Sequence, residues 1–222
     1  MPGKSARGNR LLEDALEALA RALTESGAPW MVIGGIAIIA RGVRRFTTDI
    51  DATVRGDAVR PEKVVEALRS HGIAPRIDDA LSFARVNLVL LVRHEPTGVD
   101  LDVSFGWSAF EHEALATCTL TKFGSVRIPV CTPENLVVFK AIAGRPKDAE
   151  DAEALLALYP EIDIARVRKR VAELSALAEA PELLTGFDTL AAAARPAATS
   201  ASRATRPTRV ARPVKKRRRR RK

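Results

Sequence analysis

The chain has 222 residues and a formal net charge of +9, with 36 Lys and Arg residues against 27 Asp and Glu. The charge is unevenly distributed, because 13 of the basic residues lie between Arg195 and Lys222 and no acid follows Asp188. Without that segment the chain has 23 basic and 27 acidic residues. This excludes a protein that binds nucleic acid through a net positive charge spread over the whole chain. No apolar run approaches the ~18 residues of a membrane span, and two cysteines are too few for a disulfide framework, so we expect a cytoplasmic protein.

The N-terminal half predicts alternating helices and strands. Leucines at helical spacing predict an amphipathic first helix that ends near Gly27. A short apolar strand at 30–33 is followed by a glycine pair and a buried helix at 36–40. Further elements are predicted as a strand at 50–54, a helix at 61–71, and strands at 83–92 and 99–105 that form a hairpin.

The C-terminal half predicts mainly helices. A helix at 108–116 and two short strands near Leu120 and Ile128 come first, and helices are then predicted at 132–143, 148–158, 164–178 and 181–194. The fold class is therefore α/β, more strictly α+β, with a mixed sheet flanked by helices and further helices after it. We expect four regions, namely an N-terminal helix at 1–27, an α/β core at 28–131, a helical region at 132–194 and a disordered basic tail at 195–222.

The most informative segment combines a glycine pair with two acids. Gly34 and Gly35 follow a predicted strand, where closely approaching backbone N–H groups favour an anion such as phosphate. Asp49 and Asp51 lie two residues apart on the next predicted strand, so both carboxylates leave the same face. Two like charges this close need a cation, and hard carboxylate oxygens suit Mg²⁺ bound together with a substrate phosphate.

A third carboxylate is expected from the strand at 99–105. Its apolar residues alternate with Asp100 and Asp102, which share the opposite face. Either acid could complete a site for two Mg²⁺ ions, which stabilise the attacking and leaving oxygens in phosphoryl transfer. A lone Asp-x-Asp pair is usually a solvated strand face, but its combination with a glycine pair after a strand favours a catalytic site.

These residues resemble the signature of the polymerase-β-type nucleotidyltransferase superfamily. That signature is an apolar residue, Gly-Gly or Gly-Ser, a spacer, and Asp-apolar-Asp, which reads here as Ile33-Gly34-Gly35 and Asp49-Ile50-Asp51. Within the superfamily the chain is similar to the minimal bacterial and archaeal branch, which includes nucleotidyltransferases of abortive-infection and toxin–antitoxin systems. The stretches at 45–51 and 133–151 resemble that branch's Arg-x-Thr-x-Asp-apolar-Asp motif and its helical Lys … Ala-x-Arg-x-Lys-Asp-x-x-Asp segment.

The resemblance implies roles for individual residues. Asp49 and Asp51 match the catalytic, metal-binding pair, and Asp102 matches the third acid better than Asp100 because of the pattern that surrounds it. A role in binding the nucleotide or its phosphates is implied for Gly34, Gly35, Arg45, Thr48, Lys140 and Arg145. For Lys140 and Arg145 the alternative is ordinary salt bridging on a helix surface.

The resemblance further implies Mg²⁺-dependent transfer of a nucleoside monophosphate from an NTP such as ATP to an acceptor hydroxyl. The expected acceptor is RNA, above all tRNA, with a protein hydroxyl or a small molecule as variants, and the expected protein partner is a cognate toxin or antitoxin. A non-catalytic antitoxin or RNA-binding module on the same fold is the alternative. The tail at 195–222 is either an arm for RNA or another polyanion or a solvated extension.

Overall fold

The computed structural model describes residues 3–194, in which helices and strands are interspersed up to β7 and only helices follow. The helices are α1 (Gly3–Ser26), α2 (Gly34–Ala40), α3 (Pro61–Ser70), α4 (Ala80–Asn87), α5 (Ala109–Thr117), α6 (Pro133–Ala143), α7 (Pro146–Leu158), α8 (Ile164–Leu177) and α9 (Pro181–Ala194). The strands are β1 (Trp30–Ile33), β2 (Asp49–Arg55), β3 (Ile73–Pro75), β4 (Val89–His94), β5 (Val99–Gly106), β6 (Thr119–Phe123) and β7 (Val126–Val130). The predicted tail at 195–222 lies outside the described residues.

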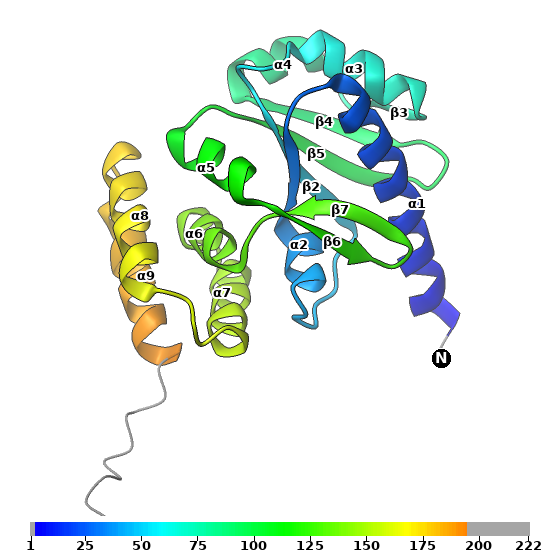
Figure 1. Ribbon diagram of the computed structural model, residues 1–222. Coiled ribbons are helices and arrows are strands. Elements are labelled where there is room, and N and C mark those ends of the chain that lie inside the picture. Colours follow the sequence, from blue (N-terminus) through cyan, green and yellow to red (C-terminus); the bar gives the residue numbers. More distant parts are fainter. Residues whose placement is uncertain (1–2, 195–222) are drawn as a thin grey trace, which may run out of the picture.

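The strands of residues 3–194 form one seven-stranded mixed sheet in the order β3-β4-β5-β2-β1-β7-β6. β2 lies at its centre, antiparallel to β1 and parallel to β5. The hairpins β4–β5 and β6–β7 are antiparallel, and the first of them was expected from the sequence pattern. Figure 1 shows helices on both sides of the sheet and α6 to α9 gathered beside it, which confirms the predicted mixed fold with helices at its C-terminal end.

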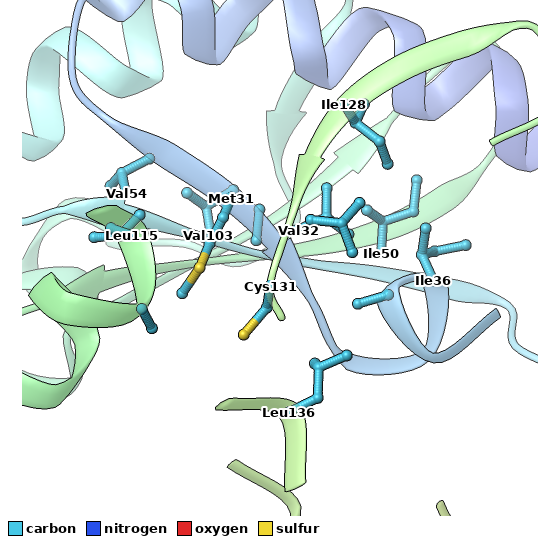
Figure 2. Close-up of a cluster of buried hydrophobic side chains, with 14 of the residues drawn as sticks. Met31, Val32, Ile36, Ile50, Val54, Val103, Leu115, Ile128, Cys131 and Leu136 are labelled. Atoms are coloured by element: carbon cyan, nitrogen blue, oxygen red, sulfur yellow. The ribbon is translucent and has the colours of Figure 1, made fainter. Parts of the chain in front are cut away.

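Alternate residues of the central strands build the hydrophobic core. Ile50, Ala52 and Val54 of β2 are fully buried, and Figure 2 shows Ile50 and Val54 among the side chains of the neighbouring strands and helices. Burial of an aliphatic side chain of this size contributes roughly 1.5–3 kcal/mol. Because β2 turns these residues into the core, the other face of the strand is the one that carries Asp49 and Asp51.

Helix α1 covers the sheet with the stripe of leucines that predicted it. Leu12, Leu16, Leu19 and Leu23 are buried at spacings of four and three residues, while Glu17 pairs with Arg21 on the exposed side. The stripe packs against α3 and against strands of the sheet. Within residues 3–194, no helix is both long and apolar enough to cross a membrane.

The predicted strand at 83–92 is wrong in its first half. Helix α4 continues to Asn87, and β4 begins only at Val89. Ala80 and Ala84 are buried one turn apart whereas Val86 is 81% exposed, so the apolar residues follow a helical and not a strand period. Leu88 adopts a left-handed conformation (φ 55°) that ends the helix. A short apolar run does not distinguish these two structures, because its length and period fit both.

Candidate active site

The register of two central strands brings the predicted acids to one face. β2 and β5 run parallel, with Asp49 opposite Asp100 and Asp51 opposite Asp102. Because opposite residues of paired strands share a face, all four carboxylates leave the same side of the sheet. Ile50, between the acids of β2, is fully buried on the other side, and a shift of one residue would exchange the two faces.

The glycine pair packs directly against this acidic face. Gly34 begins α2 with a φ of 60°, and the preceding Ile33 lies opposite Asp51 in the β1–β2 ladder. A Cβ on Gly34 would lie 1.8 Å from Oδ2 of Asp51, and a Cβ on Gly35 would lie 2.5 Å from Oγ1 of Thr47. Both positions therefore require glycine unless the neighbouring side chain moves.

A threonine hydroxyl holds the first acid in place. Thr47, which is only 6% exposed, donates a hydrogen bond from Oγ1 to Oδ1 of Asp49 at 2.6 Å. The adjacent Thr48, which the resemblance implies as a phosphate ligand, is exposed to solvent. Its role stays a prediction, whereas Thr47 has a defined contact to an acid of the site.

Asp51 is the most crowded of the acids. Burial raises the pKa of its carboxyl, and the nearby carboxylates of Asp49 and Asp102 raise the pKa further. Lys140 and a hydrogen bond from the backbone N–H of Gly35 act in the opposite direction. Like charges this close disfavour ionisation, and a bound cation would offset the repulsion.

A buried ion-pair cluster lies next to the acids. Lys140, with a side chain 7% exposed, places Nζ 2.8 Å from Oδ1 of Asp148 and 2.9 Å from Oδ2 of Asp151. Arg45 pairs with the same Oδ2 of Asp151. The cluster thereby ties α6 and α7 to the segment that precedes β2. Removal of one partner from a buried ion pair leaves an uncompensated charge and destabilises the fold. Lys140 and Arg45 therefore stabilise the fold, whether or not they also bind a ligand.

Arg145 differs from these two basic residues in its exposure. Its Nε lies 2.5 Å from Oδ2 of Asp148, yet its side chain is 59% exposed. The hydrogen bond to Asp148 raises the pKa of Arg145, and the charges of Asp51 and Asp49 contribute in the same direction. Of the basic residues implied by the resemblance, Arg145 is therefore the most accessible to an anion at the acidic face.

Comparison with known proteins now assigns the family. Residues 10–185 match a family described as "Nucleotidyltransferase of unknown function (DUF6036)". The chain is a member of this family. Its fold is similar to the solution structure of the antibiotic-resistance factor ANT(2'')-Ia, with a TM-score of 0.53 and 19% identity over 78% of this chain and 94% of that chain. The predicted polymerase-β-type nucleotidyltransferase fold is thus confirmed.

A second solved structure similar to this nucleotidyltransferase is the crystal structure of an antigenic nucleotidyltransferase-like protein from Paracoccidioides brasiliensis. It has a TM-score of 0.47 and 15% identity over 80% of this chain and 91% of that chain. No curated protein matches the sequence.

The carboxylates of Asp49, Asp51 and Asp102 are suited to a divalent cation by their chemistry and by their place on neighbouring strands. They offer hard oxygen donors on adjacent strands, and Asp51 lies within electrostatic reach of both Asp49 and Asp102. In the described part of the chain, however, no three His, Cys, Asp or Glu side chains already converge on one point. The carboxylates instead face protein partners, namely Thr47 for Asp49, the Gly35 N–H for Asp51 and Arg76 for Asp102. Because Thr47 and Arg76 each hold only Oδ1 of their acid, Oδ2 of Asp49 and Oδ2 of Asp102 are left to a cation once the acids draw together around it.

For two of these partners, Thr47 and Arg76, the sequence did not predict a role in the site. Thr47 is part of the Arg-x-Thr motif, so the motif could have indicated it, although the resemblance implied its neighbour Thr48. No sequence pattern indicates Arg76. It is 26 residues from Asp102 and follows β3, a strand of three residues that is too short to show an alternation of apolar and polar residues. Only the pairing of β3, β4 and β5 brings it to the site.

Proposed function

We propose that this nucleotidyltransferase moves a nucleoside monophosphate from an NTP to a hydroxyl of RNA, above all tRNA, in a Mg²⁺-dependent reaction. Nucleotidyl transfer in general follows from the family. The observation that supports the site is the register of β2 and β5, which sets Asp51 opposite Asp102 beside a glycine pair that leaves no room for side chains.

Asp49, Asp51 and Asp102 are the proposed ligands of two Mg²⁺ ions. When bound, the ions supply positive charge to the phosphates and lower the pKa of the acceptor hydroxyl. In this proposal the backbone turn at Gly34 and Gly35, where α2 begins, contacts the β- and γ-phosphates.

In the proposed step, Asp102 helps to accept the proton of the acceptor hydroxyl. The acceptor oxygen forms a bond to the α-phosphorus, and the bond from that phosphorus to the oxygen bridging to the β-phosphate breaks. Pyrophosphate carries away the bridging oxygen and its electron pair. Arg145, with its exposed side chain, is placed to offset the charge of the leaving group.

The remaining predicted ligands take supporting roles in this proposal. Lys140 and Arg45 hold α6 and α7 against the segment before β2 through Asp151, and Lys140 lies close enough to Asp51 for its charge to favour a triphosphate there. The basic tail at 195–222 gathers a polyanionic acceptor. A cognate toxin or antitoxin is the proposed protein partner.

The acceptor is tested by incubating the purified protein with Mg²⁺, each α-labelled NTP in turn, and tRNA, total protein or an aminoglycoside. We expect label in tRNA only, and none with Asp51→Asn. Asp57→Asn is the matched control, because Asp57 lies beyond the end of β2 and pairs with Arg55 in solvent. Label in protein or aminoglycoside would contradict the RNA acceptor, and no label with any acceptor would favour the alternative, a non-catalytic antitoxin or RNA-binding module.

A further inference from the structure

Arg76 is bonded to the acid that we propose as the third cation ligand. Its Nη2 donates a hydrogen bond to Oδ1 of Asp102, and its Nη1 lies 3.5 Å from Oδ2 of Asp100. The guanidinium thus spans two carboxylates that stand on the same face of β5. The Arg76 side chain is only 28% exposed, so this contact is partly shielded from water.

The position of Arg76 is fixed from two directions. Its backbone N–H donates to the carbonyl oxygen of Leu91 at 3.0 Å, and Leu91 is the residue opposite Asp102 in the β4–β5 hairpin. On the other side Asp100 contacts Arg76 and is itself held by Nε of Arg93 at 2.7 Å. The result is a continuous row of contacts from Arg93 through Asp100 and Arg76 to Asp102.

We propose that Arg76 is a positioning residue that orients Asp102 toward the cation site, and that Asp100 positions Arg76 instead of binding the cation. The inference rests on the proposed role of Asp102. Arg76 bonds Oδ1 of Asp102, and within residues 3–194 no hydrogen bond reaches its Oδ2. A carboxylate that is held through one oxygen presents the other in a fixed direction, as the hydrogen-bonded ligands of metal sites generally do.

The contact requires arginine because of its geometry. A guanidinium has donors in a planar fork and can reach two carboxylates at once, whereas a lysine ammonium is a single point charge. Asp102 is 40% exposed, so without Arg76 its side chain would be free to adopt several rotamers and would lose that freedom on binding a cation. Loss of Arg76 should therefore weaken cation binding even though Arg76 itself is positive.

The test is a titration of the full chain with Mn²⁺ in the absence of nucleotide, followed by electron paramagnetic resonance. We expect Arg76→Ala to bind Mn²⁺ about 10- to 100-fold more weakly than wild type, the range found for such supporting residues of metal sites. Arg76→Lys should restore part of the loss. Arg168→Ala is the matched control, because Arg168 belongs to an exposed ion pair with Asp188, outside the row of contacts that leads to Asp102, and it should bind Mn²⁺ as wild type does.

The thermal unfolding of each variant separates positioning from folding. Arg76→Ala removes two partly exposed ion pairs and Arg168→Ala removes one, so both should unfold close to the wild-type temperature. Wild-type or tighter Mn²⁺ binding by Arg76→Ala would overturn the inference, the latter because Arg76 would then compete with the cation. Asp51→Asn tells the two proposals apart: if it also binds Mn²⁺ normally, the cation site itself fails, and the inference fails with it.

Discussion

Gly34 and Asp51 fit together with no room for a side chain, since a Cβ on Gly34 would lie 1.8 Å from Oδ2 of Asp51. The same glycine has a φ of 60°, a conformation that other residues adopt only with strain. The turn that starts α2 and the acid of β2 therefore depend on each other, and one substitution tests both requirements.

We expect Gly34→Ala to displace the Asp51 carboxylate and to abolish Mn²⁺ binding and nucleotidyl transfer. The positive φ and the close contact together should lower the free energy of unfolding by about 1–3 kcal/mol. Gly98→Ala is the control, since Gly98 has a φ of 72° but nothing within 4 Å of the added Cβ. That variant should lose about 1–2 kcal/mol in urea unfolding from the left-handed backbone alone and keep Mn²⁺ binding. Equal effects of the two substitutions on Mn²⁺ binding would contradict the role of the Gly34–Asp51 contact.

The sequence predicts the acidic face because its signals are local. A spacing of two residues on a strand places Asp49 and Asp51 on one face whatever the rest of the fold does. Helix ends are equally local: Thr132, Pro133 and Gly144 delimit α6 where the sequence predicts it. The segment at 83–92 fails because ten residues of mixed apolar character fit a helix as well as a strand.

The partners of the site residues are not predictable in the same way, because they depend on long-range packing. The sequence leaves Lys140 as a phosphate ligand or a surface salt bridge, but the fold buries it between Asp148 and Asp151. The contact between Arg76 and Asp102 requires the pairing of three strands, one of them β3, which no pattern indicates.

We expect Asp148→Asn to destabilise the fold in a pH-dependent way. Burial by itself would raise the pKa of Asp148, but hydrogen bonds from Arg145 and Lys140 outweigh it and lower the pKa below its ordinary value. A lowered pKa contributes stability above the ordinary pKa of about 4, which is lost as the pH falls through the folded-state pKa. The variant should lose about 3 kcal/mol at pH 7, because Lys140 keeps only one carboxylate partner.

The measurement is urea unfolding of wild type and Asp148→Asn between pH 7 and pH 3, and the difference should shrink toward the acid end. Asp188→Asn provides the comparison, because Asp188 makes two hydrogen bonds to Arg168 but lies in solvent. We expect that variant to unfold like wild type at pH 7. A difference for Asp148→Asn that stays constant over this pH range would contradict the assignment.

Thr47→Val should lower the rate of nucleotidyl transfer about 10-fold, because a hydrogen bond to a charged group contributes ~1.5 kcal/mol or more. Valine keeps the shape of the buried side chain but removes the donor to Asp49. Thr48→Val, the exposed neighbour, should retain wild-type rates. If Thr48→Val alone lowers the rate and raises the KM for NTP, the phosphate role implied for Thr48 by the sequence is correct and Thr47 only supports the loop.

Deletion of residues 195–222 should weaken binding of tRNA and leave binding of NTP unchanged. The deleted segment carries 13 basic residues and no acid, and contacts to phosphates weaken steeply as salt increases. Fluorescence anisotropy with labelled tRNA at several salt concentrations measures the effect, and the slope of affinity against salt should become shallower. An unchanged slope would show that the tail does not contact the RNA.

The position of the label in the NTP tests the central claim most directly. Wild-type protein and Asp51→Asn are incubated with Mg²⁺, tRNA and NTP labelled at either the α- or the γ-phosphate. Transfer of a nucleoside monophosphate predicts that the α-label enters the RNA, that the γ-label leaves as pyrophosphate, and that Asp51→Asn does neither. Entry of the γ-label into the acceptor, or wild-type rates with Asp51→Asn, would contradict a nucleotidyltransferase site built on Asp49, Asp51 and Asp102.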